Sequence, residues 1–155
     1  MSGYIVIKEE NPDSPDAARL MDELSDALKA ITGDSGRSSF STEDACGPRS
    51  IFVIACRDGE AVGCGALRPI DDDIAEVKRM YAKQKGMGIG TKILSYLESK
   101  AREMGYSALR LETRRINRNA VLFYEKSGYH RIPNYGKYAD RPEAVCFEKQ
   151  LMKGL

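Results

Sequence analysis

The sequence lacks the features that would place the protein in a membrane or on nucleic acid. No apolar run in its 155 residues approaches the roughly 18 residues that a membrane span needs. The start, MSGYIVIKEE, has no basic segment followed by a long apolar one, so we expect no signal peptide. The formal net charge is only +1, whereas nucleic-acid modules carry a strong basic excess. We therefore expect a cytoplasmic protein with neither a membrane nor a nucleic-acid partner.

Cysteine and histidine are scarce, which argues against a metal site. The cysteines form no CxxC pair, so the pattern indicates reduced thiols; they are Cys46, Cys56, Cys64 and Cys146. The one histidine, His130, stands at the start of a predicted strand, and the pattern does not favour a catalytic role for it. The aspartates at 71–73 are typical of a solvated turn. We predict that the protein holds no metal.

What is present is the composition of one globular domain, which we expect to span residues 1–155. Hydrophobic residues are 42% of the chain and charged residues 30%. Apolar, β-branched runs predict strands at 4–10, on both sides of a turn at Asp58-Gly59 within 51–70, within 71–82, and at 106–115 and 143–151. Helical spacing and end signals predict helices from Ser14 to Gly33, from near Gly88 to Gly105, and over 117–129. The order predicts a mixed α/β sheet.

In the first helix, a recurring helical spacing predicts one apolar face, made of Leu20, Leu24, Leu28 and Ile31. Ser14 is placed to cap this helix, and Pro15 suits its first position.

A glycine-rich turn, QKGMGIG (84–90), separates a predicted strand from a predicted helix. Glycine there serves either a positive φ or the close approach of a ligand to the main chain. A helix start also offers free N–H groups to an anion, and Lys85, Thr91 and Lys92 flank it. The spacing fits neither a dinucleotide GxGxxG nor a P-loop. Taken alone, the turn leaves an anion site and a plain loop both open.

Three blocks together resemble the GNAT superfamily of N-acetyltransferases. KGMGIG (85–90) resembles the family's [QR]-x-x-G-x-[GA] turn, with Lys85 as a departure from glutamine or arginine. AEVKRMYA (75–82) resembles the strand before that turn, and NRNAVLFYEKSGY (117–129) resembles the family's N-x-x-A-[IV]-x-[LF]-Y-E-K-x-G-[FY] helix. The resemblance covers roughly residues 50 to 151 and is weakest over 1–49.

This resemblance implies a central sheet whose fourth and fifth strands splay apart, flanked by helices, with acetyl-CoA as co-substrate between them and no metal. The pantetheine arm would pair with the fourth strand as an added strand does, and the pyrophosphate would meet the turn. The implied cofactor-binding residues are Met80, Tyr81, Ala82, Lys85, Gly86, Met87, Gly88, Ile89, Gly90, Thr91, Asn117, Asn119 and Tyr124.

The implied reaction is the attack of a neutral amine on a thioester. A lysine-like amine has a pKa of about 10.4, so a proton must first be removed. By resemblance Glu76 is the candidate base, with water as the alternative, and Tyr124 is the candidate acid for the leaving thiolate. A backbone N–H within 80–82 could stabilise the oxyanion.

Two segments could shape the acceptor site, 33–47 and 130–143. The second carries Tyr135, Tyr138, Asp140 and Arg141 among turn-forming residues, which suits a small polar amine or an amine bearing a carboxylate. Arg37 and Arg49 could bind a carboxylate, although surface arginines are common.

We therefore expect an acetyl-CoA-dependent N-acetyltransferase that acts on a primary amine, with a small molecule favoured as acceptor. A protein or peptide acceptor and a non-catalytic acyl-CoA-binding regulator remain alternatives. A homodimer is possible.

Overall fold

A computed structural model describes residues 4–37 and 40–151. The ends of the expected domain 1–155, and positions 38 and 39 of the segment 33–47, lie outside the described residues. A seven-stranded sheet forms the centre, in the order β1-β2-β3-β4-β5-β7-β6. The strands are β1 (Ile5–Glu9), β2 (Ile51–Arg57), β3 (Glu60–Pro69), β4 (Ile74–Ala82), β5 (Ala108–Arg114), β6 (His130–Ile132) and β7 (Ala144–Gln150). Every neighbouring pair is antiparallel except β4 and β5, which are parallel.

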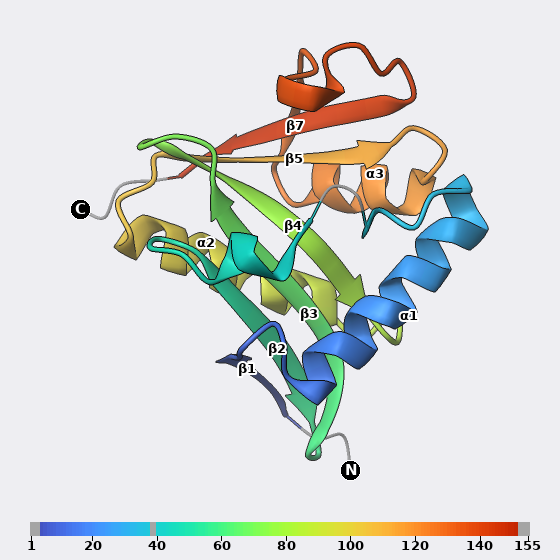
Figure 1. Cartoon of the computed structure of the whole chain (residues 1–155), viewed down its shortest axis with the longest axis vertical. Helices are drawn as coiled ribbons and strands as arrows, with labels where there is room; N and C mark the ends of the chain where they lie inside the picture. Colours follow the sequence, from blue (N-terminus) through green and yellow to red (C-terminus); the bar gives the residue numbers. More distant parts are fainter. Residues whose placement is uncertain (1–3, 38–39, 152–155) are drawn as a thin grey trace.

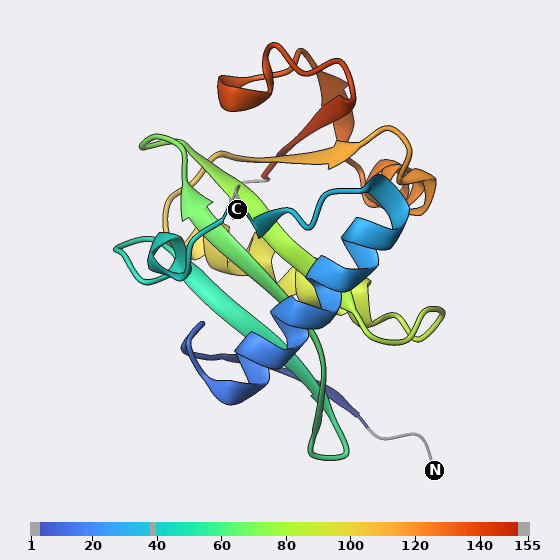
Figure 2. The same cartoon turned by 45° about the vertical axis from the view of Figure 1, so that its right-hand side comes forward.

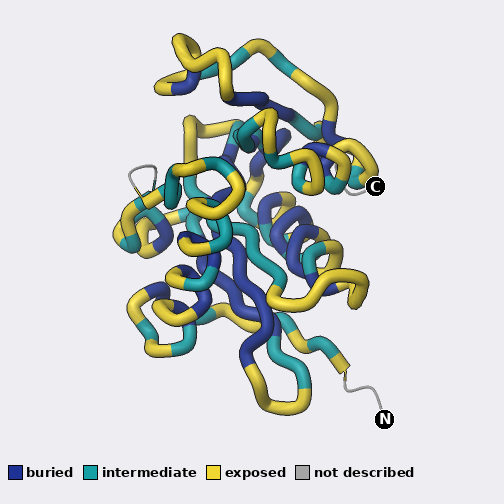
Figure 3. Tube along the Cα trace, turned by 90° about the vertical axis from the view of Figure 1, so that its right-hand side faces the viewer, coloured by how far each residue is buried: buried dark blue, intermediate teal, exposed yellow. Residues whose placement is uncertain are grey.

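Helices cover both faces of the sheet (Figure 1). Helix α1 (Pro15–Thr32) lies across one face, where Leu20 and Met21 pack against Phe52 and Ile54. Helices α2 (Ile89–Glu103) and α3 (Arg118–Lys126) lie on the other face and enclose the larger core. The central strands are accordingly buried along most of their length, whereas the turns are exposed (Figure 3). None of the helices in the described residues is long and apolar enough to cross a bilayer.

The helix ends follow the local signals of the sequence. The Ser14 hydroxyl accepts a hydrogen bond from the Ala17 N–H at 3.1 Å, and Gly33 ends α1 in the left-handed conformation. The predicted apolar spacing holds for Leu20 and Leu24 but is wrong at Ile31, whose surface is 41% exposed. The last turn of α1 borders a cavity at Leu28 and Thr32, and Ile31 lies on the solvent side of that turn.

Strand β3 carries two glycines, Gly63 and Gly65, which the sequence analysis did not single out. A Cβ atom on Gly63 would lie 2.7 Å from the Tyr81 carbonyl oxygen, and one on Gly65 would lie 2.8 Å from a methyl group of Ile93. These glycines allow α2 and β4 to approach β3 more closely than any side chain would permit. The position of α2 against the sheet therefore depends on them.

We expect Gly63→Ala to destabilise the fold by about 1–3 kcal/mol, because backbone and helix must both move to admit one methyl group. Urea denaturation measures the change. Gly47→Ala is the matched control, since its Cβ would meet only an ordinary contact 3.7 Å away at Ser50 Oγ. Equal stability of both variants would contradict this account of the packing.

Candidate active site

The site begins where β4 and β5 stop pairing. The two strands are hydrogen-bonded only over Ile74–Glu76 and Ala108–Arg110. Beyond that point β4 continues to Ala82 beside β3, while β5 continues to Arg114 beside β7. The strands run apart from there (Figure 2). One edge of β4 is left without a strand partner, and this is the splay expected of the fourth and fifth strands.

A bulge in β4 lies directly beside the opening. The register with β3 shifts between Cys64 and Ala66, and Arg79 takes a φ of 56°. The Arg79 guanidinium reaches across to α1, where it donates to the Met21 carbonyl at 3.0 Å and to the Ser25 hydroxyl at 2.6 Å. Arg79 thereby fastens α1 over the opening.

The opening holds a cavity of about 140 Å³. Its wall comes from α1 and the segment after it, from β4, β5 and α3, and from the segment between α3 and β7. The polar side chains of the lining are Thr32, Asp34, Lys78, Arg79, Glu112, Thr113, Arg114, Asn117, Tyr124, Tyr138 and Arg141. A small, strongly charged cavity, partly open to solvent, thus lies between the splayed strands.

Tyr124, on α3, forms part of the wall of this cavity. Its side chain is only 8% exposed, and its hydroxyl makes no hydrogen bond to any residue that the structure describes. Burial raises the pKa of the Tyr124 phenol, so it stays protonated. A buried thiolate would be destabilised as well, because burial disfavours the charged form of a thiol. The phenol therefore remains a usable proton donor to a thiolate.

Glu76, the candidate base from the sequence, lies outside the lining of the cavity. Its carboxylate is 2% exposed and is already held by two partners, the Tyr135 hydroxyl at 2.6 Å and the Arg68 guanidinium at 3.1 Å. Two carboxyl groups do line the cavity, those of Asp34 after α1 and of Glu112 on β5. Burial raises the pKa of Glu112, partly offset by the charges of Arg114 and Lys78.

Lys78 is a cavity residue that the sequence analysis missed. Its buried ammonium donates a hydrogen bond to the Tyr138 hydroxyl at 2.8 Å and lies 3.9 Å from the Glu76 carboxylate. Burial lowers the pKa of Lys78. Side chains alternate along β4, so Lys78 lies on the same face as Glu76. This alternation was the one sequence signal that could have identified Lys78 as a site residue.

The glycine turn leads into α2, and this helix start has no side-chain cap. Gly86 and Gly88 have φ values of 80° and 72°, and a Cβ atom on either would meet nothing within 4 Å. Gly90 differs, because its Cβ would lie 3.3 Å from the Phe123 ring, so this glycine allows α2 and α3 to pack closely. The turn from Lys85 to Gly88 is exposed. The free N–H groups of the first helical turn are therefore open to a ligand.

The other expected cofactor residues are divided between the cavity and the surface. Met80 lines the cavity, whereas the Tyr81 hydroxyl turns toward α1 and donates to Glu23 at 3.1 Å. Asn117 lines the cavity and caps α3 by accepting from the Ala120 N–H at 3.4 Å. Asn119 is exposed on the first turn of α3. Ala82, Met87, Ile89 and Thr91 complete the line from β4 through the turn into α2.

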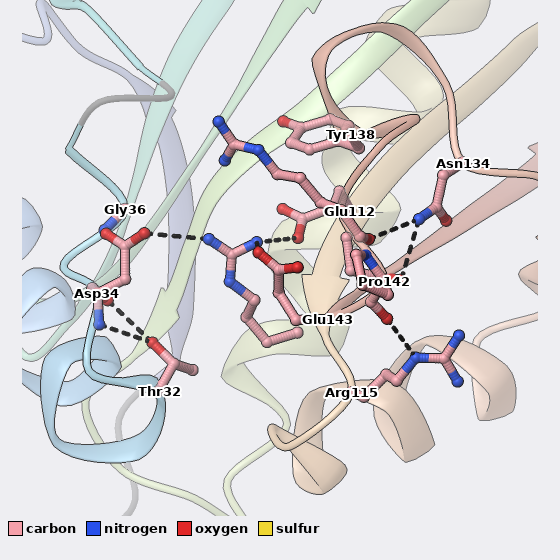
Figure 4. Close-up of polar contacts among 12 residues, drawn as sticks. Thr32, Asp34, Gly36, Glu112, Arg115, Asn134, Tyr138, Pro142 and Glu143 are labelled. Carbon is pink, nitrogen blue, oxygen red and sulfur yellow. Dashed lines mark hydrogen bonds and ion pairs between the residues drawn. The ribbon is translucent and has the colours of Figure 1, made fainter.

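The two segments that the sequence suggested for the acceptor meet at one cavity. Asp34 and Gly36 line it from the first segment, and Tyr138 and Arg141 from the second. In Figure 4, Asp34 and Glu112 lie on opposite sides of a guanidinium; the ion pairs, at 3.0 and 3.2 Å, identify it as that of Arg114. Glu143 of the second segment lies 3.9 Å from the same group. Arg114 thus joins both segments to β5.

Several other candidates lie away from the cavity. Arg37 forms an exposed pair with Asp22, and Arg49 donates to the carbonyls of Met104 and Asp72. Tyr135 is bound to Glu76, while Asp140 and His130 are exposed outside the lining. The second segment also contains secondary structure, β6 at its start and a 3₁₀ turn, η3 (Gly136–Tyr138), which carries Tyr138 to the cavity. The other 3₁₀ turn, η2 (Thr42–Ala45), lies in the first segment.

Comparison with known proteins defines the class to which this fold and site belong. The model of the acetyltransferase (GNAT) family matches residues 17–129. A protein of Azospirillum brasilense named IAA acetyltransferase is 31% identical over 151 residues, which cover 95% of this chain and 98% of that protein. The chain therefore belongs to the GNAT family and is an N-acetyltransferase, an enzyme of acetyl-CoA-dependent acyl transfer.

Solved structures agree with this assignment. A Klebsiella pneumoniae structure described as an acyl-CoA N-acyltransferase is 29% identical, with a TM-score of 0.80, covering 96% of this chain and 98% of that one. A GNAT acetyltransferase of Elizabethkingia anophelis, solved with acetyl-CoA bound, has the same fold with a TM-score of 0.70 at 18% identity, covering 95% of this chain and 98% of that one.

We expect Arg79→Met to lower the free energy of unfolding by about 1–3 kcal/mol, since it removes charged hydrogen bonds from Arg79 to α1. Amide hydrogen exchange should show the protection lost chiefly in the middle of α1, around Met21 and Ser25. Arg19→Met is the control, because its ion pairs with Asp16 and Glu23 lie at the surface of the same helix. Unchanged hydrogen exchange in α1 of the Arg79 variant would contradict the role of Arg79 in holding α1 across the opening.

Proposed function

We propose that the enzyme transfers an acetyl group from acetyl-CoA to the primary amine of a small molecule by direct attack on the thioester. The observation that carries this proposal is the cavity between β4 and β5, with the Tyr124 hydroxyl in its wall and without a partner among the described residues. A direct transfer needs the thioester, the amine and a proton donor to lie close together, and a cavity at this place would allow it.

Acetyl-CoA would lie along the free edge of β4 and end at the glycine turn. The pantetheine arm would pair with the backbone of Met80, Tyr81 and Ala82, because that edge has no strand partner in β5. The pyrophosphate would accept hydrogen bonds from the uncapped N–H groups of residues 86–91, aided by the positive end of the α2 dipole and by the Lys85 charge. Asn117 and Asn119 would border the arm from α3.

Proton removal from the amine is assigned to Glu112. Its carboxyl lines the cavity, and its raised pKa brings it nearer to that of an amine than an ordinary glutamate is. For Glu76 we propose a positioning role, since its carboxylate holds Tyr135 and Arg68 beside the site. Tyr124 would give its phenolic proton to the departing thiolate, and a β4 backbone N–H near Met80 would stabilise the oxyanion.

A small acceptor is favoured over a peptide by the two segments that border the cavity. The segments after α1 and after α3 both reach the cavity, and Arg114 ties them to β5 through Asp34 and Glu143. A peptide would need an open groove across this edge. The cytoplasmic location and a homodimer stay predictions of the sequence.

The direct test is release of CoA thiol from acetyl-CoA across amino acids, polyamines, aminoglycosides and lysine peptides, with a no-acceptor control. Turnover with one class of free amine supports the proposal. Faster turnover of lysine peptides would favour the peptide alternative. Tight binding of acetyl-CoA without any turnover would favour the regulatory alternative.

We expect Gly88→Val to raise the KM for acetyl-CoA by about 10- to 100-fold, because a side chain at φ 72° disturbs the N–H groups that would hold the pyrophosphate. Isothermal titration and steady-state kinetics measure the loss. Gly59→Val is the matched control, since Gly59 also has a positive φ, 81°, and an open Cβ position, but lies in the β2–β3 turn. Equal acetyl-CoA affinity in both folded variants would contradict the pyrophosphate site.

We expect Tyr124→Phe to lower kcat by about 10²–10⁴-fold, the usual loss when a general acid is removed. Stability should change little, because the hydroxyl has no partner among the described residues. Tyr129→Phe is the reverse control: it removes a buried hydrogen bond of 2.9 Å to Glu98 and should cost stability while kcat persists. An unchanged kcat in Tyr124→Phe would remove the proposed acid.

A further inference from the structure

The charges of the cavity are unequal in number. Four cationic side chains line it, Lys78, Arg79, Arg114 and Arg141, against two carboxylates, Asp34 and Glu112. Arg114 is paired with both of these carboxylates, and Lys78 is bound to Tyr138 close to Glu76. Both carboxylates of the cavity are therefore already paired with Arg114, and Arg79 and Arg141 have no ion pair with either of them.

Among the described residues, Arg79 and Arg141 are the two cavity cations without an ion pair, but Arg79 is already held by neutral acceptors on α1, which leaves Arg141 as the cation without a side-chain partner. Within the described residues its guanidinium has no ion pair within 4.0 Å, and the hydrogen bonds of this residue are all made by its backbone. It is nevertheless close enough for its charge to lower the pKa of Asp34 and of Glu112 among lesser causes. Arg141 is an exposed residue, so its guanidinium lies at the open side of the cavity near Asp34 and Glu112, with its donors facing solvent.

The segment that carries Arg141 is held firmly. The Arg141 carbonyl accepts from the Asn134 amide at 3.0 Å and from the Ala144 N–H at 3.0 Å, and its own N–H donates to the Tyr138 carbonyl at 3.0 Å. The next residue, Pro142, accepts from Arg115 at 2.7 Å (Figure 4). A cation on a rigid support loses little freedom when it binds, which is what a recognition residue requires.

A second free donor occurs in the same wall. The Nε atom of Arg79 is buried and has no hydrogen-bond partner among the described residues. Buried donors without a partner are rare. The other nitrogens of Arg79 already donate to α1, so Arg79 holds that helix and the ligand contact is left to Arg141.

We propose that the acceptor amine also carries a carboxylate, which pairs with Arg141 while the amine lies beside Glu112. The proposal rests on the proposed function and adds the substrate class. Guanidinium and carboxylate match in planar geometry and can share two hydrogen bonds. A cavity of about 140 Å³ suits the size of an amino acid, since an engineered cavity of about 150 Å³ holds benzene.

The test compares acceptors that differ only in the carboxylate. Glycine, leucine, phenylalanine, β-alanine and γ-aminobutyrate are each assayed beside their carboxamides, with O-phosphoethanolamine as the phosphate-bearing amine and putrescine as the amine without an acid. We expect kcat/KM to be about 10- to 100-fold higher for at least one acid than for its carboxamide. In Arg141→Gln this preference should disappear through the acceptor KM, with the KM for acetyl-CoA unchanged.

Arg131→Gln is the matched control, because Arg131 is exposed on β6 outside the cavity and its removal changes the charge equally. It should keep the preference for the acid. A preference for carboxamides, putrescine or O-phosphoethanolamine overturns the carboxylate proposal and leaves the transferase standing. A preference for the acid that survives in Arg141→Gln overturns the role of Arg141. No turnover with any acceptor overturns both this proposal and the proposed function.

Discussion

The site depends on one event in the sheet, the end of hydrogen bonding between β4 and β5 after Glu76 and Arg110. A buried strand edge without partners is costly, because each free N–H and C=O must find another partner. The protein keeps this edge open by bending β4 at Arg79 and by using the side chain of that residue to hold α1 across the gap. The same separation creates the cavity and exposes the backbone against which an extended ligand can pair. The cofactor edge and the acceptor cavity are therefore two consequences of one interruption.

Burial then biases the chemistry of the cavity toward neutral groups. It raises the pKa of Glu112 and of Tyr124, and it lowers the pKa of Lys78. The same effect acts on any amine that enters, because the ammonium form loses hydration and the neutral amine loses little. The neutral amine is the form that attacks a thioester. Burial in the cavity thus lowers the free-energy cost of deprotonating the ammonium group. The catalytic base needs to overcome only the part of this cost that is left.

Local signals predicted the elements well, because each signal acts within a few residues. Ser14 and Asn117 cap helices where the sequence placed them, and the turn at Asp58 and Gly59 joins β2 to β3. Contacts across the sheet were not predictable in this way. Nothing near Glu76 in the sequence shows that Tyr135, 59 positions later, occupies its carboxylate. Likewise, Gly63 and Gly65 are needed only because α2 packs on them. The family resemblance supplied the splay of β4 and β5, and the sequence suggested the two acceptor segments, but their connection through Arg114 was visible only in the folded structure.

The glycine turn departs from the usual rule that a side chain caps the start of a helix. Ser14 and Asn117 each close a helix start with a side chain, which contributes about 1 kcal/mol. Helix α2 forgoes that gain and begins at Gly88 with a left-handed residue and free N–H groups. The glycines of the turn are not equivalent, because Gly86 and Gly88 serve the backbone conformation, whereas Gly90 makes room for Phe123 of α3. Since α3 also carries Tyr124, that contact fixes the distance between the helix start and the hydroxyl in the cavity. One short turn therefore affects both ends of the proposed cofactor path. Its free N–H groups serve the phosphate end, and the packing of Gly90 against Phe123 serves the thioester end.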